Sequence, residues 1–268
     1  MTEETPLKTP PLLPATKLFP PRLPSGLIDR PRLNGLAGQA ESKRLTVIKA
    51  PAGFGKTSLA LAWLSRLRAG GAQVAWLSLD TEDDEPARFL HHLAHAFRNA
   101  CGNVGASAIG LTAEASLVPA NSIVSTLINE LVDVDDEVYL VLDDYHLITI
   151  PAIHDAMSFF IENAPSHLHV VVCTRTDPAL PLARLRARNN LLEIDASMLR
   201  FNFDETRSFV ESECPGKLGA SSIKSLFAST EGWAAALRIS TSVLARLAVD
   251  KRAQAVARAQ ELGLVGRL

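Results

Sequence analysis

The chain has 268 residues and a formal net charge of −2, and 47% of its residues are hydrophobic and 21% charged. This composition excludes a disordered chain, because so much apolar surface can offset the entropy that is lost on folding. The length predicts one large domain, or a medium-sized domain with a smaller neighbour. The near balance of acidic and basic residues argues against a protein that binds nucleic acid through a basic surface.

The cysteines and the N-terminus indicate where the protein works. Cys101, Cys173 and Cys214 lie far apart and form no CxxC pair, so neither a disulfide framework nor a zinc site is predicted. No apolar segment approaches the roughly 20 residues that a membrane-spanning helix needs. The first residues are acidic and interrupted by proline, which is not typical of a signal peptide. We therefore expect a soluble, cytoplasmic protein without a membrane partner.

The N-terminal segment is rich in proline. Residues 1–31 contain eight of the 16 prolines, which excludes a helix or a central strand there. We predict an extended arm over 1–31 that either wraps around a domain or hangs free. A short helix is expected within residues 27–44.

Strand and helix patterns then alternate from about residue 45 to 195. Short apolar segments predict buried strands at 45–50, 72–80, 137–146, 167–178 and 190–195. Amphipathic or alanine-rich segments predict helices at 58–70, 86–102, 120–134 and 150–165, and residues 102–118 are expected to form a loop. Because uniformly apolar strands between helices form parallel sheets covered on both faces, we predict an α/β fold with a five-stranded parallel sheet. After residue 195 the pattern predicts helices alone.

The most specific motif is APAGFGKT, residues 50–57. It matches the phosphate-binding loop GxxxxGK[ST] with alanine in the first position, and a predicted strand and helix flank it as the motif requires. Its glycines allow backbone N–H groups to point at phosphate oxygens, while Lys56 would reach the β- and γ-phosphates and Thr57 would hold Mg²⁺. The predicted nucleotide contacts are Ala50, Gly53, Phe54, Gly55, Lys56, Thr57 and Ser58.

A second motif lies at the end of the third predicted strand, where VYLVL runs into Asp143 and Asp144. Aspartates after a strand also cap turns, so this pattern alone does not decide between a cap and a catalytic pair. The upstream phosphate-binding loop favours the catalytic interpretation. Asp143 would then hold Mg²⁺, and Asp144 would polarise the attacking water as a general base.

A third candidate is Arg175, in the segment TRTDP after the fourth strand. A guanidinium at this edge of the sheet can sense the γ-phosphate or stabilise charge in the transition state. A surface salt bridge to Asp177 explains the same residues equally well.

These motifs resemble a known family. The segments TKLFPPRLPSGLIDRPRL, APAGFGKT, VYLVLDDYH, TRTDPALPLARLRARNNLLEI, LRFNFDET and TEGWAAALRIS occur in this order over about residues 16–248. They are similar to the ATPase region of MalT-like, large ATP-binding regulators of the LuxR group, which are STAND-class P-loop ATPases. The resemblance implies a P-loop NTPase core at 32–197 and a small lid-like or winged-helix-like helical subdomain at 198–268.

The resemblance also implies roles for residues outside the shared motifs. Ile28, Asp29 and Arg30 match a segment that contacts adenine. Trp233 matches a motif that approaches the nucleotide from the helical subdomain, although Ala234 replaces its usual proline. It implies a slow, Mg²⁺-dependent ATPase that self-associates with ATP and rests with ADP. Such regulators continue into a sensor region and a helix-turn-helix domain. These are not expected within the 268 residues, so DNA contact is not expected from this chain alone.

Two other functions stay open. The first is a module that binds ATP or ADP without hydrolysis and controls self-association. The second is a small-molecule phosphotransferase, since kinases share the phosphate-binding loop.

Three polar clusters have simpler structural interpretations. We interpret the acids Glu82–Glu85 as caps of the next helix. We interpret His91 and His95 as part of a solvated or partly packed helix face, and Arg184, Arg186 and Arg188 as a solvated helix face.

Overall fold

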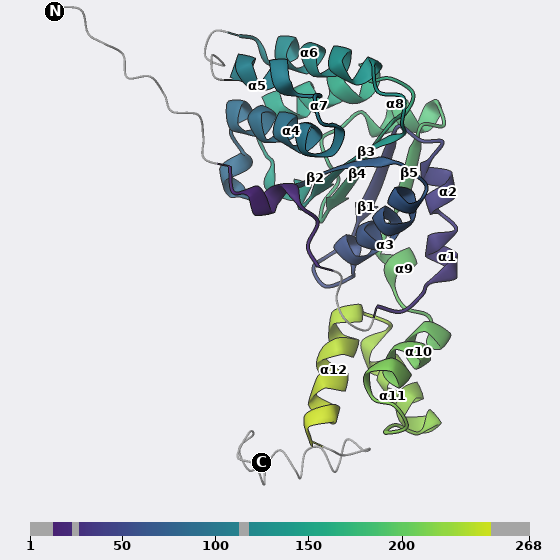
Figure 1. Ribbon diagram of the computed structural model, residues 1–268. Helices are drawn as coiled ribbons and strands as arrows, with labels where there is room; N and C mark the ends of the chain where they lie inside the picture. The colour runs from purple at the N-terminus through teal and green to yellow at the C-terminus, as the bar shows by residue number, and fades with distance from the viewer. Residues whose placement is uncertain (1–12, 23–26, 113–117, 248–268) are drawn as a thin grey trace, which may run out of the picture.

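The computed structural model describes residues 13–22, 27–112 and 118–247, and it shows a sheet-containing body with a smaller helical body below it (Figure 1). The five strands are parallel, in the order β2-β3-β4-β1-β5, so the predicted α/β class and parallel sheet are confirmed. The strands are β1 (Leu45–Lys49), β2 (Gln73–Ser78), β3 (Val138–Asp143), β4 (Leu168–Thr174) and β5 (Leu191–Ile194).

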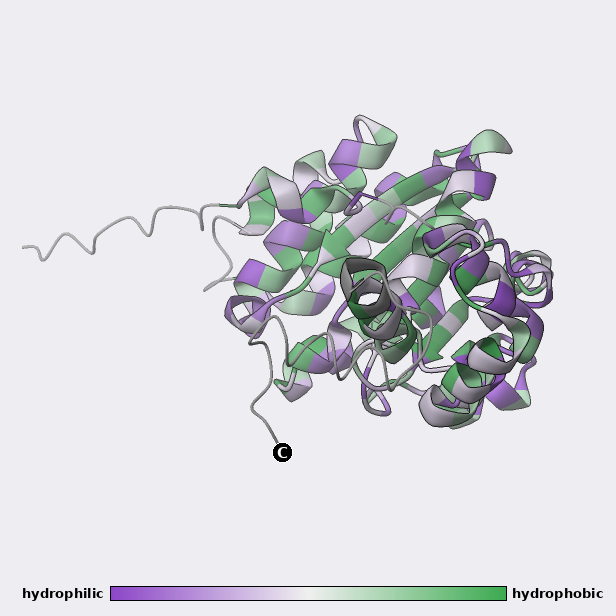
Figure 2. Cartoon of the chain, turned by 90° about the horizontal axis from the view of Figure 1, so that it is seen from below, coloured by the Kyte–Doolittle hydropathy of each residue, from purple (hydrophilic) through white to green (hydrophobic). Residues whose placement is uncertain are grey.

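Helices cover both faces of this sheet, and side chains alternate between two cores. In β3, Leu140 and Leu142 face one core, while Tyr139 and Val141 face the other. The first core lies under α4 (Pro86–Cys101), α5 (Ala106–Thr112), α6 (Ala120–Val132), α7 (Pro151–Asn163) and α8 (Leu182–Ala187). The second lies under α1 (Pro31–Asn34), α2 (Ala37–Ala40), α3 (Lys56–Ala69) and α9 (Ala196–Leu199). Figure 2 shows hydrophobic residues concentrated on the strands.

Two local predictions are wrong. The single short helix expected within 27–44 is two short helices, α1 and α2. The segment 102–118, expected to be a loop, contains α5. Glu130 of α6 stabilises its start, because the carboxylate accepts hydrogen bonds from the N–H groups of Gly105 and Ser107. A helix of only two turns with a tertiary cap has too few residues for a periodic pattern in the sequence.

Among the described residues, the smaller body has three helices, α10 (Phe203–Glu213), α11 (Ala220–Thr230) and α12 (Ala234–Leu247). A capping box begins α10: the side chain of Asn202 accepts from the N–H of Glu205, whose carboxylate accepts from the N–H of Asn202. Residues 248–268 of the predicted helical subdomain lie outside the described residues.

Two arginines connect the segment before α1 to the start of the helical body. Arg30 Nη2 donates to the carbonyls of Leu199 and Arg200, both at 2.8 Å. The same nitrogen lies 3.1 Å from Glu205, and Arg32 Nε lies 2.9 Å from it. Glu205 is buried, so its carboxylate depends on these two cations for charge compensation. The ion cluster fixes where the helical body begins relative to the core.

The described part of the N-terminal arm packs against the sheet-containing body. Contrary to the prediction of an extended arm without a helix, Ala15–Leu18 form a short 3₁₀ helix, η1, which contacts β2 and α4. Lys17 Nζ lies 2.7 Å from both Asp80 and Asp83, and His92 Nδ1 donates to Asp83 at 2.6 Å. Residues 1–12 and 23–26 of the predicted arm lie outside the described residues.

The acidic run therefore does more than cap a helix. Glu85 does cap α4, accepting from the N–H groups of Ala87 and Arg88. Asp83, however, is fully buried in the cluster with Lys17, and Asp84 accepts hydrogen bonds from Thr149 and Ile150. A linear pattern of acids does not distinguish these roles, because the partners of Asp83 and Asp84 come from distant segments.

The histidine and arginine clusters are also packed or paired. His91 is buried and lies 2.8 Å from the hydroxyl of Thr112. Arg184 pairs with Glu162 and Arg186 pairs with Glu193. In the described ranges, no group of three or more side chains is arranged to hold a metal, and no helix is long and apolar enough to span a bilayer.

We expect Asp83→Asn to lower the free energy of unfolding by about 3 kcal/mol near neutral pH, because it removes the buried carboxylate and leaves the buried Lys17 ammonium with only the half-exposed Asp80 as a counter-charge. Hydrogen bonds from His92 and Lys17 hold the pKa of Asp83 at about 2, against the opposing effect of its burial. A carboxylate with a depressed pKa stabilises the fold above its unfolded pKa, and this stabilisation disappears as the pH falls through about 2.

Urea unfolding at about pH 7 and about pH 2.5 tests this, with the exposed Asp135→Asn as a control. The difference between wild type and Asp83→Asn should shrink at the lower pH. A difference that stays constant would show that the ionised pair does not stabilise the fold.

Candidate nucleotide-binding site

The loop between β1 and α3 has the conformation that its glycines allow. Gly53 and Gly55 have φ angles of 78° and 85°, a region that residues with a Cβ atom adopt at a cost. The helix that follows begins at Lys56. Free backbone N–H groups and the positive end of the helix dipole therefore face the position where a phosphate would lie.

Lys56 is buried against this loop. Its side chain donates to the carbonyls of Ala50 at 2.8 Å and Pro51 at 3.1 Å. Burial lowers its pKa, and the nearby charges of Asp143 and Asp144 act in the opposite direction. Within the described residues no carboxylate lies within ion-pair distance of this ammonium. An anionic phosphate would supply the counter-charge that the site lacks.

Thr57, at the start of the helix that follows β1, and Asp143, at the end of β3, converge although β4 separates these two strands. The Thr57 hydroxyl lies 3.0 and 3.1 Å from the two carboxylate oxygens of Asp143. Burial, and then the charge of Asp144, raises the pKa of Asp143. A hydroxyl and a carboxylate close together are the ligands that Mg²⁺ prefers, and a divalent cation would relieve the cost of burying this charge. The residues present therefore fit a magnesium ion.

Asp144 follows in a left-handed conformation, with φ of 59°. This backbone is uncommon for a residue other than glycine and turns the side chain away from the strand. Its carboxylate is 46% exposed and lies 3.7 Å from Nδ1 of the half-buried His146. Asp144 is thus accessible to water beside the buried Asp143, which suits a group that would orient water.

Arg175 lies just beyond the end of β4 and is exposed. The predicted salt bridge to Asp177 is absent, since Asp177 instead pairs with Lys49 at 2.6 Å. In the part of the chain that the structure describes, no ion pair of Arg175 is found. Its positive charge contributes to lowering the pKa values of Lys56 and His146, which places it in the electrostatic field of the phosphate-binding loop.

The helical body contacts this loop directly. The N–H of Ala235, at the start of α12, donates to the carbonyl of Gly53 at 3.0 Å, and Trp233 Nε1 donates to Ala52 at 3.3 Å. The rings of Trp233 and Phe54 stack with their centroids 6.3 Å apart. Phe54 and Trp233, both predicted to contact the nucleotide, therefore contact each other over the loop. The contact of Ala235 with the loop was not predicted from the sequence.

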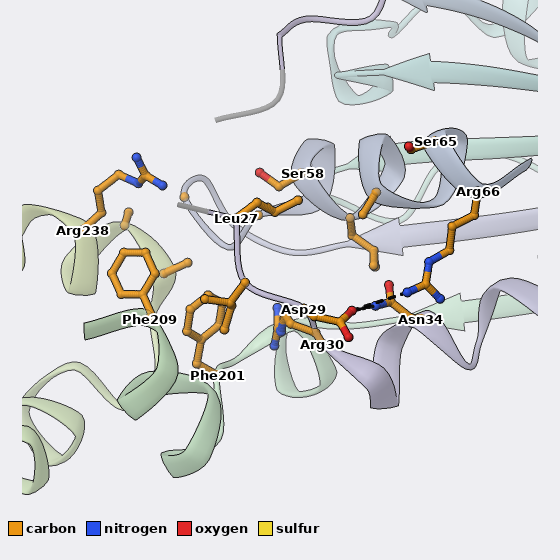
Figure 3. Close-up of a pocket in the computed structure, with 17 residues that line it drawn as sticks. Leu27, Asp29, Arg30, Asn34, Ser58, Ser65, Arg66, Phe201, Phe209 and Arg238 are labelled. Atoms are coloured by element: carbon orange, nitrogen blue, oxygen red, sulfur yellow. Dashed lines mark hydrogen bonds and ion pairs between the residues drawn. The ribbon is translucent and has the colours of Figure 1, made fainter. Parts of the chain in front are cut away.

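A cavity of about 530 Å³ extends from the loop along α3 (Figure 3). Its volume is typical of small-molecule sites. Gly53, Gly55 and Ser58 lie at one end, and Asp29, Asn34 and Arg66 lie at the other. Between them the lining is mainly apolar: Leu27, Ile28, Leu59, Ala62, Phe201, Phe209, Ala234 and Ala235.

The structure brings most predicted residues to this cavity or to the loop beside it. Ile28 lines the cavity, as does Arg30, although the terminal nitrogen of Arg30 binds the carbonyls before α10 and its guanidinium lies 4.4 Å above Phe201. Of the described part of the proline-rich arm, residues 27–30 line the cavity, whereas residues 13–22 do not. Phe201 and Phe209 were missed, because nothing in their local sequence indicates that α10 meets α3.

We expect Gly53→Ala to displace the helical body. The added Cβ would lie 2.6 Å from that of Ala235 and 3.0 Å from Trp233 Nε1, and the positive φ would add about 1–2 kcal/mol of strain. Trp63 and Trp76 are buried whereas Trp233 is 40% exposed, so a shift of tryptophan emission to longer wavelength reports Trp233. Gly38→Ala is the control, since its Cβ meets nothing within 4 Å. Identical spectra for the two variants would contradict the contact.

No family model matches this chain. It is 36% identical over 228 residues to the HTH-type transcriptional regulator MalT of Klebsiella pneumoniae, covering 85% of this chain and 25% of MalT. It is 35% identical over 236 residues to the serine/threonine-protein kinase PknK of Mycobacterium tuberculosis, covering 88% of this chain and 21% of PknK. The chain thus spans a quarter or less of these relatives' lengths.

Solved structures agree on the fold. The Walker-type ATPase of Pyrococcus abyssi matches with a TM-score of 0.55 and 11% identity, over 88% of this chain and 72% of that one. The Orc1 protein of Aeropyrum pernix, solved in complex with DNA, matches with a TM-score of 0.52 and 18% identity, over 87% and 64%. The chain therefore has the P-loop NTPase fold and is related, over most of its length, to the ATPase region of the MalT-like regulators.

Proposed function

We propose that this chain binds ATP and ADP with Mg²⁺, hydrolyses ATP slowly, and serves as the switch module of a cytoplasmic, MalT-like transcriptional regulator. One observation carries the proposal. Lys56, Thr57, Asp143 and Asp144 meet at the carboxyl edge of the sheet, at one end of a cavity large enough for a nucleoside. The sequence similarity to MalT supports the regulatory part.

The phosphates would lie on the loop N–H groups and the start of α3, with Lys56 exchanging its bonds to Ala50 and Pro51 for phosphate oxygens. Thr57 and Asp143 would hold the magnesium ion, which when bound neutralises the negative charge of the phosphates. The ribose and base would then extend along α3 into the apolar part of the cavity.

Asp144 would orient the attacking water and accept its proton, and Arg175 would stabilise charge on the γ-phosphate. Slow turnover is consistent with the geometry, because the Asp144 side chain is half exposed and Arg175 has no fixing ion pair among the described residues. Rate enhancement by such groups depends on their being held in place before the reaction.

The contacts of Ala235 and Trp233 with the loop suggest how the bound nucleotide, ATP or ADP, influences the orientation of the helical body. A change of phosphate at the loop would move the carbonyls that these two residues bind, and so favour one orientation of α10–α12. We propose that the ATP state exposes a self-association surface and that the ADP state hides it. DNA contact is not expected from this chain alone.

We expect Lys56→Ala to weaken ATP and ADP binding at least tenfold, because it removes a charge-assisted hydrogen bond from a buried site. Equilibrium dialysis with each nucleotide and Mg²⁺ measures this, with the exposed Lys224→Ala as a control. Unchanged affinity in Lys56→Ala would show that the phosphates bind elsewhere.

We expect Asp144→Asn to bind ATP with wild-type affinity but to lose at least about 100-fold in single-turnover hydrolysis, since the amide cannot accept the proton of water. Sedimentation should show more self-association of this variant with ATP than of wild type. The exposed Asp135→Asn is the control. If neither the variant nor wild type turns over although both bind, the chain is the non-hydrolysing module instead.

A further inference from the structure

His146 has a buried nitrogen atom to which the proposed function gives no role. Its side chain is only 12% exposed, and Nδ1 is buried without a hydrogen-bond partner among the residues that the structure describes. Buried polar atoms in folded proteins almost always have a partner, because an unmet hydrogen bond inside a protein is costly. The orphaned nitrogen therefore indicates a partner that His146 gains when the site is in use.

The backbone after β3 brings the ring of His146 close to Asp144. Asp144 is in the left-handed conformation, and its N–H donates to Oδ1 of Asp143 at 3.2 Å. A 3₁₀ helix, η3 (Tyr145–Leu147), follows, and the N–H of Leu147 donates to the carbonyl of Asp144 at 3.0 Å. This tight turn leaves Nδ1 of His146 3.7 Å from Oδ1 of Asp144. That distance is too long for a hydrogen bond, but a small side-chain rotation closes it.

Of these two side chains, Asp144 is the one that is free to rotate. Its carboxylate is 46% exposed, whereas the imidazole of His146 is mostly buried and so has little room to move. A shift of about 0.5–1 Å would bring Oδ1 within hydrogen-bond distance of Nδ1. Because a carboxylate has two acceptor oxygens, Oδ2 would stay available for a water molecule.

The surroundings of the ring favour a neutral imidazole with its proton on Nδ1. Burial lowers the pKa of His146, and the positive charges of Arg175 and Lys56 act in the same direction, against the opposing charge of Asp144. A neutral imidazole carries one N–H, and a carboxylate beside Nδ1 stabilises the tautomer that donates from this nitrogen. A neutral donor orients Asp144 without cancelling its charge, so the carboxylate can still accept a proton from water.

From this geometry, and resting on the proposed function, we propose that His146 is a positioning residue for hydrolysis, whose Nδ1–H binds Oδ1 of Asp144 and so orients Oδ2 toward the attacking water. The water oxygen then bonds to the γ-phosphorus, its proton passes to Oδ2, and the bond to the bridging oxygen breaks, which releases ADP. His146 touches neither the water nor the nucleotide. It reduces the number of orientations that an exposed carboxylate can adopt.

Two variants separate the hydrogen bond from the volume of the ring. In His146→Leu the side chain fills space but donates nothing, whereas in His146→Asn the amide can donate from about the position of Nδ1. We expect His146→Leu to bind ATP with Mg²⁺ within about twofold of wild type but to lose at least about tenfold in single-turnover hydrolysis. We expect His146→Asn to keep most of the rate, which a role in packing alone would not explain.

Equilibrium dialysis and rapid-quench kinetics on the full chain measure affinity and rate. His167→Leu is the matched control, since His167 precedes β4 at the opposite edge of the sheet, where its Nε2 lies 3.1 Å from the carbonyl of Leu131. In an Asp144→Ala background, His146→Leu should cause no further loss of rate, because His146 acts through that carboxylate. Equal losses in His146→Leu and His146→Asn, or a full further loss in the Asp144→Ala background, would overturn the inference.

Nuclear magnetic resonance of histidine ring nitrogens gives a readout that needs no turnover. The signal that disappears in His146→Asn belongs to His146, and its chemical shift reports which ring nitrogen carries the proton. With ATP and Mg²⁺ bound, we expect a protonated Nδ1 whose signal changes in Asp144→Ala. An unprotonated Nδ1, or a signal that Asp144→Ala leaves unaltered, overturns the inference at any ATPase rate. Wild type that binds ATP without turnover contradicts the proposed hydrolysis instead, and the spectrum still decides whether His146 binds Asp144.

Discussion

The site depends on one contact across the sheet, the hydrogen bonding of Thr57 to both carboxylate oxygens of Asp143. The two residues follow β1 and end β3, strands that β4 separates. They meet because parallel strands bring their carboxyl ends to one edge. The proposed phosphate site lies at this edge of the sheet. Lys56 precedes Thr57, Asp144 follows Asp143, and Arg175 follows β4, the strand between β1 and β3.

A second set of contacts makes the helical body part of the site. The buried Glu205 joins Arg30 and Arg32 to the start of α10, and Ala235 and Trp233 bind the carbonyls of the phosphate-binding loop. The cavity exists because these two connections hold α10 and α12 opposite α3. Breaking the ion pairs of the buried Glu205 with the two arginines is costly, so this connection holds the start of α10 in place. The hydrogen bonds of Ala235 and Trp233 to the loop are weaker, so this connection can change with the bound nucleotide.

Local sequence predicted the fold well where periodicity and length were sufficient. The five strands are mostly apolar, which favours a buried parallel sheet, and the phosphate-binding loop is flanked as its motif requires. Prediction failed where the partner is distant in sequence. The helix α5 is capped by Glu130, and Asp83 is neutralised by Lys17 and His92, so neither role is visible in the residues nearby.

The sequence by itself determined the chemistry of the phosphate end, because a loop that must curl around an anion needs glycine, lysine and threonine at set spacings. The tertiary structure alone decided the base end. Asp29, Arg66 and Phe201 come from a segment before the sheet, a core helix and the start of the helical body, and no spacing rule connects them. The tertiary structure also decided that Arg175 forms no ion pair with Asp177, because Asp177 pairs with Lys49 of the neighbouring strand β1.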